Sequence, residues 1–120
     1  MSSSFVIDPT MQAAMSALDG LSQRQNAISR NLANVDTPGY HTKDINFQAA
    51  IQRVMNEGND VRLENVSSEV EGLPERPDGN NVNIDRESML MAQTQLQYQM
   101  GVQLIKAEFH RLLTAIKDGN

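Results

Sequence analysis

The sequence predicts a mainly α-helical fold, in which long N- and C-terminal helices pack as an antiparallel-type coiled-coil hairpin and the middle segment is irregular and loop-rich. Apolar residues recur at helical spacing at both ends of the 120-residue chain, whereas proline and glycine interrupt the middle. The composition is 39% hydrophobic but only 4% aromatic, with no tryptophan. So few large rings favour helix-on-helix packing over a thick globular core.

Residues 1–35 form the first predicted element, the N-terminal helix of the coiled-coil core. Asp8 and Pro9 have the residue types of an N-cap followed by a first helical position. The following apolar or small residues are separated alternately by three and four positions, which is a heptad pattern with one polar member. This predicted intrachain seam consists of Met11, Ala14, Leu18, Leu21, Gln25, Ile28, Leu32 and Val35. The helix is expected to end before Pro38, because proline disfavours helical geometry at the residue that precedes it.

Residues 36–84 form the second predicted element, an irregular middle segment with a candidate short helix near 45–56. Its later part combines glycines and prolines with many carboxylates, a composition typical of loops. Within it, the sequence Asp78-Gly79-Asn80-Asn81 has the composition of a tight turn.

Residues 85–120 form the third predicted element, the C-terminal helix of the core. Asp85 is the expected N-cap, with Ile84 and Met89 as a hydrophobic staple. Apolar residues occupy two stripes on roughly opposite faces. The first stripe is Met89, Ala92, Leu96, Met100 and Leu104, and the second is Met91, Tyr98, Val102, Ile105, Phe109, Leu112 and Ile116. Because the N-terminal helix can cover only one face, the other is expected to contact something else, as core or as an intersubunit surface.

A row of glutamines, Gln95, Gln99 and Gln103, lies between the two stripes. It has two interpretations, a neutral helix surface or interhelical hydrogen bonds that fix the register of a coiled coil.

The charge and composition exclude several classes of protein. The formal net charge of −5 argues against nucleic-acid binding and against a basic membrane-surface helix. We find neither an apolar run long enough to span a bilayer nor a secretory signal, so no direct membrane insertion is expected. Cysteine is absent, and neither His41 nor His110 has a partner at metal-site spacing. We therefore predict no enzyme activity, catalytic residue, metal, cofactor or small-molecule substrate.

One motif carries a family resemblance. The stretch Asn31-Leu32-Ala33-Asn34-Val35-Asp36-Thr37-Pro38-Gly39-Tyr40 resembles the N-terminal signature of bacterial flagellar basal-body rod proteins, in which an amphipathic helix ends in A-N-x-[DN]-T-P-G-Y. The family turn motif here is Asn34, Asp36, Thr37, Pro38, Gly39 and Tyr40. The continuation Lys43-Asp44-Ile45-Asn46-Phe47 is similar to that of the proximal rod subunits. The segments Asn81-Val82-Asn83-Ile84-Asp85-Arg86-Glu87 and Leu96-Gln97-Tyr98-Gln99-Met100 resemble their C-terminal helix.

This resemblance implies a structural subunit of the proximal rod, which polymerises into the shaft joining the membrane ring to the distal rod and hook. Such a shaft serves motility, torque transmission and export. The implied partners are other rod subunits, the rod–ring junction protein, the membrane-ring protein and further copies of the chain in a helical assembly. The implied location is the flagellar basal body, in the periplasmic space if the cell has two membranes, after type III export without a cleaved signal peptide. Two alternatives remain open, another rod subunit of the same family and a non-flagellar, soluble helical-hairpin adaptor.

The Pro38-Gly39 pair has a purely structural interpretation as a type II turn, which favours proline followed by glycine. Our functional hypothesis is that this turn redirects the chain from the helix to the middle segment and that Tyr40 anchors it against a neighbour.

Overall fold

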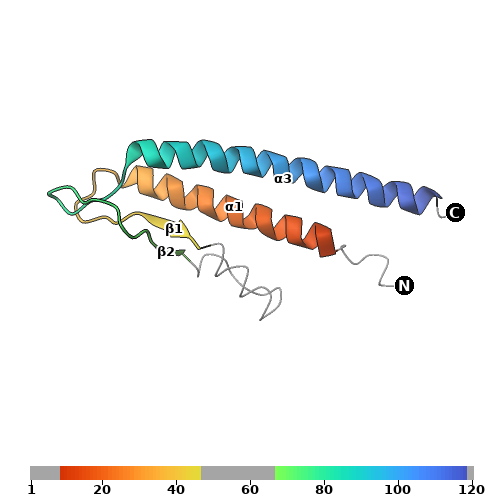
Figure 1. Cartoon of the computed structure of the whole chain (residues 1–120), viewed down its shortest axis with the longest axis horizontal. Helices are drawn as coiled ribbons and strands as arrows, with labels where there is room; N and C mark the ends of the chain where they lie inside the picture. Colours follow the sequence, from red (N-terminus) through yellow and green to blue (C-terminus); the bar gives the residue numbers. More distant parts are fainter. Residues whose placement is uncertain (1–8, 47–66, 119–120) are drawn as a thin grey trace.

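The structure, a computed structural model, describes residues 9–46 and 67–118. Helix α1 (Pro9–Ala33) and helix α3 (Ile84–Asp118) lie side by side and antiparallel, as Figure 1 shows. Strands β1 (Lys43–Ile45) and β2 (Ser67–Glu69) form an antiparallel β-ribbon in which Lys43 pairs with Glu69. The predicted helical hairpin with a loop-rich middle is therefore confirmed.

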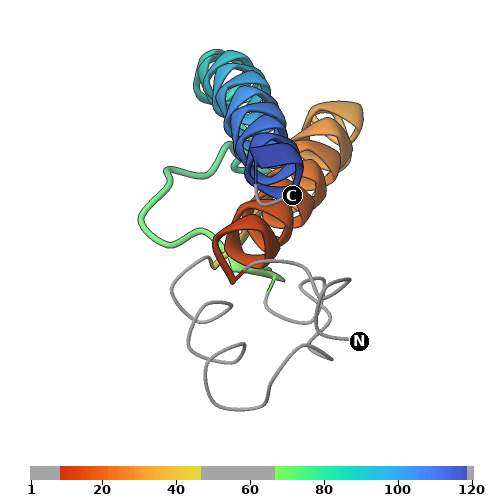
Figure 2. The ribbon, with the colours of Figure 1, turned by 90° about the vertical axis from the view of Figure 1, so that its right-hand side faces the viewer.

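The molecule is elongated, measuring 68 × 28 × 19 Å with a radius of gyration of 18.4 Å. A compact domain of this length would have a radius of gyration of about 14 Å. Helix α1 contacts both α3 and β1, so it lies between its partner helix and the β-ribbon. Figure 2 shows this arrangement from the end of the hairpin.

Helix α1 begins at Pro9, as expected, and ends at Ala33. The Asn34 N–H donates to the carbonyl oxygens of both Arg30 and Asn31, at 3.1 and 3.2 Å, which is typical of a tightening last turn. Val35 lies beyond the helix, in a turn closed by its N–H to the Leu32 oxygen. Val35, the last residue of the predicted seam, therefore lies just past the end of α1.

Helix α3 begins one residue earlier than predicted, and its N-cap is Asn83 rather than Asp85. The Asn83 Oδ1 accepts the Arg86 N–H at 3.0 Å, which satisfies a backbone donor of the first turn. Ile84 and Met89 are both exposed, at 53% and 63%, so the expected staple does not bury them.

The candidate short helix near 45–56 is not supported at its start, because Ile45 is the last residue of β1. The remainder of that range, from residue 47, lies outside the described residues.

Two contacts define the register of the hairpin. Asn31 hydrogen-bonds Glu87 near the connected ends, and Leu18 lies against Gly101 farther along. Because both helices rise by the same distance per residue, this register places Pro9 opposite about residue 110 of α3. The last turns of α3 therefore extend past the first residue of α1, as is visible in Figure 1.

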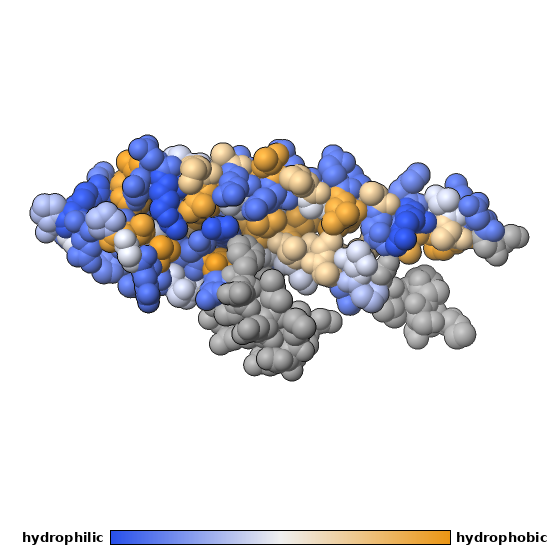
Figure 3. Space-filling view, viewed as in Figure 1, coloured by the Kyte–Doolittle hydropathy of each residue, from blue (hydrophilic) through white to orange (hydrophobic). Residues whose placement is uncertain are grey.

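The interior of the described chain contains few large apolar side chains. The buried apolar residues are Met11, Ala27, Ile28, Ile45 and Val82, and the buried polar residues are Asn31, Thr42, Asn80, Asn81, Glu87 and Thr94. Figure 3 shows apolar side chains reaching the surface along the hairpin. Within the described residues, no helix has the length and apolar character needed to cross a membrane.

Candidate functional site

The connected ends of the helices form a junction that we call the hairpin base, consisting of residues 31–43 and 76–87. The family turn motif lies here. The Tyr40 N–H donates to the Thr37 oxygen at 3.2 Å, and Gly39 has φ +75°. These features define a type II turn with proline and then glycine at its centre, as the sequence predicted. The Gly39 N–H also donates to the Asp78 oxygen at 2.9 Å, which ties the turn to the later loop.

Asn31 is the central side chain of the hairpin base and is 1% exposed. Its amide nitrogen donates to the Lys43 oxygen at 2.8 Å and to Glu87 Oε1 at 2.6 Å. Its amide oxygen accepts the Tyr40 hydroxyl at 3.0 Å and the Lys43 N–H at 3.1 Å. Both donors and both acceptor positions of the amide are therefore used. One side chain of α1 thus holds the turn, β1 and α3 together.

Tyr40 uses its hydroxyl within its own chain through this bond to Asn31. Burial raises the pKa of the phenol above its usual value of 10.0, with the charge of Glu87 acting in the same direction and that of Arg30 opposing it. The hydroxyl is therefore a neutral donor over the physiological pH range. The contact between Tyr40 and a neighbouring molecule stays a prediction.

The other members of the family turn motif act locally or face solvent. The Asn34 side chain donates to the Arg30 oxygen at 2.8 Å and accepts the Thr37 hydroxyl at 3.0 Å. These two bonds close the last turn of α1. Asp36 and Pro38 are exposed.

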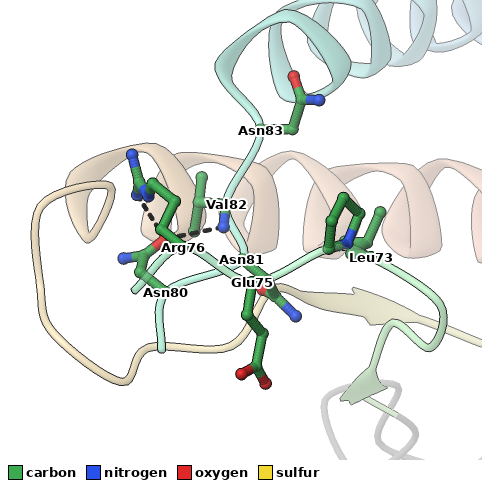
Figure 4. Close-up of a pocket in the computed structure, with 8 residues that line it drawn as sticks. Leu73, Glu75, Arg76, Asn80, Asn81, Val82 and Asn83 are labelled. Carbon is green, nitrogen blue, oxygen red and sulfur yellow. Dashed lines mark hydrogen bonds between the residues drawn. The ribbon is translucent and has the colours of Figure 1, made fainter. Parts of the chain in front are cut away.

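Asn80 lies in the segment that leads into α3, on the other side of the hairpin base, and is fully buried. Its amide nitrogen donates to the oxygens of Asn34 and Thr37 at 2.9 and 2.8 Å. Its amide oxygen accepts the Val82 N–H at 2.8 Å and the Arg76 guanidinium at 2.6 Å, the two bonds drawn in Figure 4. Sequence analysis assigned this residue only to a tight turn and missed its role.

Asn81 makes a second set of bonds across the base. Its side-chain oxygen accepts the Thr42 N–H at 2.6 Å, and its own N–H donates to the Tyr40 oxygen at 3.3 Å. In the sequence, three asparagines cluster just before a helix, a pattern that does not reveal which backbone groups their side chains bond.

A shallow pocket of about 260 Å³ lies beside this cluster. Figure 4 shows its walls, which are Leu73, Pro74, Glu75, Arg76, Asn80, Asn81, Val82 and Asn83. The Arg76 guanidinium bonds the Val35 oxygen and the Asn80 side chain. Both bonds come from Nη2, so Arg76 joins the end of α1 to the later loop beside the pocket.

Two further interactions secure the base. The Arg24 guanidinium makes a bidentate contact with the Asp44 carboxylate, at 3.1 and 3.0 Å, which holds β1 against the side of α1.

The Glu87 carboxylate is fully buried and hydrogen-bonds Asn31 at 2.6 Å, whereas the Arg86 guanidinium lies 3.4 Å from it. Burial raises the pKa of Glu87 above its usual value of 4.5, against the opposing effects of Asn31 and Arg86.

On the face of α3 that packs toward α1, two sets of residues each recur at every seventh position. Glu87, Thr94, Gly101 and Glu108 form one, and Met91, Tyr98, Ile105 and Leu112 form the other. The first series is small or polar, and its members are buried or half-buried. A Cβ at Gly101 would approach Leu18 Cδ2 to 2.7 Å, so glycine allows the helices to approach closely there. Sequence analysis missed this series because its residues are not apolar.

On α1, the predicted seam residues lie at different depths. Met11 and Ile28 are buried, and Ala14, Leu18, Leu21, Gln25, Leu32 and Val35 are half-buried. The seam therefore contributes apolar packing along α1, with Val35 in the turn that follows it.

The first stripe of α3 is exposed along its whole length. Its large side chains, Met89, Leu96, Met100 and Leu104, are between 56% and 64% exposed. At 100° per residue, this stripe lies on the side of the helix opposite Thr94 and Gly101. In the second stripe, Met91, Val102, Ile105 and Leu112 are half-buried, whereas Tyr98, Phe109 and Ile116 are exposed. Gln95, Gln99 and Gln103 are also exposed.

Among the described residues, no group of three or more histidine, aspartate or glutamate side chains is arranged to hold a metal ion. The candidate site instead has two parts. One is the exposed first stripe of α3, and the other is the polar hairpin base, which fixes the arrangement of the two helices.

Comparison with known proteins identifies relatives along almost the whole chain. The family model for flagella basal body rod proteins matches residues 11–41, which span most of α1 and the family turn motif. The flagellar basal body rod protein FlgB of Escherichia coli K12 is 30% identical over 134 aligned residues, covering 95% of this chain and 97% of the relative.

FlgB of Salmonella typhimurium LT2 is 31% identical over the same coverage. FlgB of Bacillus subtilis 168 is 28% identical, covering 92% of this chain and 95% of the relative. The similarity thus includes both helices and the hairpin base as well as the turn motif. The chain belongs to the flagellar basal body rod protein family and is a structural component of that rod.

Proposed function

We propose that this chain is a proximal rod subunit that polymerises through the exposed stripe of α3 and joins the membrane ring to the distal rod and hook. The observation that carries the proposal is the stripe of Met89, Leu96, Met100 and Leu104, more than half exposed on the face opposite α1. Fully burying one such side chain contributes about 1.5–3 kcal/mol. The stripe therefore offers several kcal/mol to a neighbouring subunit.

A contact of this kind supports a helical assembly. In a rod, the stripe of one subunit would contact a different surface of the next subunit, because pairing of two identical stripes would close a dimer. Repeated head-to-tail contacts with a rotation that does not close build an open helix, which is the form of a rod. The expected partners are other rod subunits and copies of this chain, with the rod–ring junction protein and the membrane-ring protein at the proximal end.

The proposal also includes location and chemistry. The subunit would be exported by the flagellar type III apparatus without a cleaved signal peptide, and would lie in the basal body, in the periplasmic space of cells with two membranes. Its role would be mechanical rather than enzymatic: transmitting torque and surrounding an export channel. The hairpin base supports such a role because its side chains bond one another and hold the two helices in a fixed register.

Charge substitution on α3 tests the stripe. Leu96→Asp should leave helical content unchanged in the purified chain, since residue 96 is exposed there, and should abolish motility when it replaces the wild-type copy. Gln99→Asp is the matched control, because it places the same charge on the same helix outside the stripe and should preserve motility. Full motility with Leu96→Asp would refute the stripe as an assembly surface.

Gene deletion tests the wider function. Cells lacking this chain should be non-motile, and their isolated basal bodies should lack rod and hook. If flagella form normally without it, the chain is not a required rod subunit. Electron cryo-microscopy of wild-type basal bodies then tests the proximal assignment, which requires density for the hairpin next to the membrane ring.

A further inference from the structure

His41 lies between two carboxylates that belong to different segments. Its Nδ1 is 3.2 Å from Glu69 Oε2, at the end of β2, and its Nε2 is 2.9 Å from Glu75 Oε1, in the loop that follows. A neutral imidazole carries one N–H and can donate to only one carboxylate, whereas the imidazolium carries two. This geometry fits the protonated ring, whose Nδ1 hydrogen-bonds Glu69 while its positive charge also attracts the Glu75 carboxylate beside Nε2.

The surroundings of His41 favour that charged form. Its hydrogen bond to Glu69 raises the pKa of the imidazole above 6.5, and the charges of Glu69 and Glu75 and the Gly79 carbonyl act in the same direction. Slight burial acts in the opposite direction. Lys43, which pairs with Glu69 in the register of the ribbon, is the neighbouring cation.

The position of His41 makes this pairing structurally important. The Val70 N–H donates to the Thr42 oxygen at 2.9 Å, and the Arg76 N–H donates to the Asn80 oxygen at 2.8 Å. The contact from His41 to Glu75 lies between these two attachment points, and the contact to Glu69 lies at the end of the ribbon. The His41 ring thus connects the segment that follows the type II turn to β2 and to the loop 70–79.

We propose that His41 is a proton-operated clasp, which holds β2 and the loop 70–79 on the hairpin base when the ring is protonated and releases Glu75 when it is not. The sign follows from the direction of the shift. The clasp contributes its full stabilisation below about pH 6.5, where the ring is protonated even in the unfolded chain. That contribution is lost as the pH rises through the higher pKa of the folded chain. The proposal does not depend on assembly through the α3 stripe.

A pH titration by NMR on the full chain tests the clasp. The His41 ring signals should titrate with a midpoint above that of an unstructured histidine. Glu69→Gln and Glu75→Gln should each lower that midpoint, because each removes one carboxylate. Glu71→Gln is the matched control, because it removes an exposed carboxylate of the same loop, and it should leave the His41 midpoint unchanged. If neither substitution moves the His41 midpoint, the proposal is wrong.

A second measurement separates the clasp from a simple pKa effect. The ¹H–¹⁵N heteronuclear NOE of Glu71, Gly72, Leu73 and Glu75 should be high at pH 5.5 and fall by pH 8.5 in the wild type. In His41→Gln it should be low at both pH values, and in His110→Gln it should follow the wild type. Values in the wild type that do not change with pH would overturn the proposal even if the His41 midpoint is raised.

Discussion

Leu18 of α1 lies directly against Gly101 of α3, at a place where a Cβ on residue 101 would come within 2.7 Å of the leucine Cδ2. The contact occurs in the middle of the hairpin, well away from the polar base. A side chain at residue 101 would therefore require the half-buried Leu18 side chain to move. The heptad pattern of large apolar residues gives no indication of this close contact.

Gly101→Ala should destabilise the hairpin although alanine is the better helix former. The new methyl group overpacks the seam at a cost of about 1–3 kcal/mol, which exceeds the gain of about 1 kcal/mol in helix propensity. In a Leu18→Ala background the clash is gone, so the same substitution should stabilise the chain. Urea unfolding of the four proteins measures this reversal of sign, and additive effects would contradict the close contact.

Thr94→Val should stabilise the chain by about 1 kcal/mol. The Thr94 hydroxyl is buried and has no hydrogen-bond partner among the described residues. Replacing it with a methyl group of similar shape removes the cost of desolvating an unpaired polar group. Thermal unfolding followed by circular dichroism measures the change. Thr114→Val is the control, because that hydroxyl is exposed and bonds the His110 oxygen. A wild type as stable as Thr94→Val would indicate that the hydroxyl is satisfied in solution.

Asn80→Ala should lower the free energy of unfolding by about 2–3 kcal/mol, because it leaves the buried carbonyls and the Val82 N–H without their partner. Asn80→Asp should be at least as damaging, since a carboxylate cannot donate to the oxygens of Asn34 and Thr37. Asn26→Ala, on the exposed side of α1, is the matched control and should change stability by less than about 0.5 kcal/mol. Equal stabilities for Asn80→Ala and Asn26→Ala would contradict the bonding described for the base.

Glu87→Gln should alter how stability depends on pH. Because the pKa of Glu87 is raised in the folded chain, the folded state binds this proton more tightly than the unfolded state does. The resulting stabilisation is complete below the usual value of 4.5 and is lost as the pH rises through the folded pKa. Glutamine keeps an oxygen for Asn31 and has no charge to bury.

The variant should therefore gain stability relative to the wild type between pH 4 and pH 7. Chemical unfolding at several pH values measures the difference, and Glu71→Gln makes the same change of charge on an exposed loop as a control. A difference between wild type and Glu87→Gln that stays constant with pH would show that the carboxyl is not buried in solution.

Ile105→Asp and Leu96→Asp should fail in different ways. Ile105 is half-buried in the series that faces α1, so a charge there should unfold part of the hairpin and reduce helical content. Leu96 is exposed, so the corresponding charge should leave the isolated chain folded. Circular dichroism of both purified variants makes the comparison. Equal loss of helix would mean that both faces of α3 are covered within one chain.

The parts of the fold that repeat along the sequence could be predicted, whereas the long-range polar contacts could not. Periodicity located both helices, Pro9 marked the start of α1, and the proline–glycine pair marked the type II turn. The bond between Asn31 and Glu87 joins residues 56 positions apart and leaves no periodic signal. Asn83 displaced Asp85 as the cap because the two residue types cap equally well, and only the backbone geometry distinguishes them.

Gly20 illustrates a related difficulty. In sequence it is a weak point of a helix, yet it is buried within α1, and Gly101 of α3 is half-buried against Leu18. A glycine that permits a close approach cannot be distinguished, in one sequence, from a glycine that merely weakens a helix. The candidate surface was easier to anticipate, because a helix with two apolar stripes and one partner helix must leave one stripe uncovered.

The four bonds of Asn31 have a mechanical consequence. Asn31 belongs to α1, and its side-chain amide hydrogen-bonds the backbone of Lys43 on one side and the carboxylate of Glu87 on the other. A force applied along β1 is therefore shared between the last turn of α1 and the first turn of α3. It does not separate one helix from the other. A force that enters through the β-ribbon therefore acts on both helices of the hairpin at once.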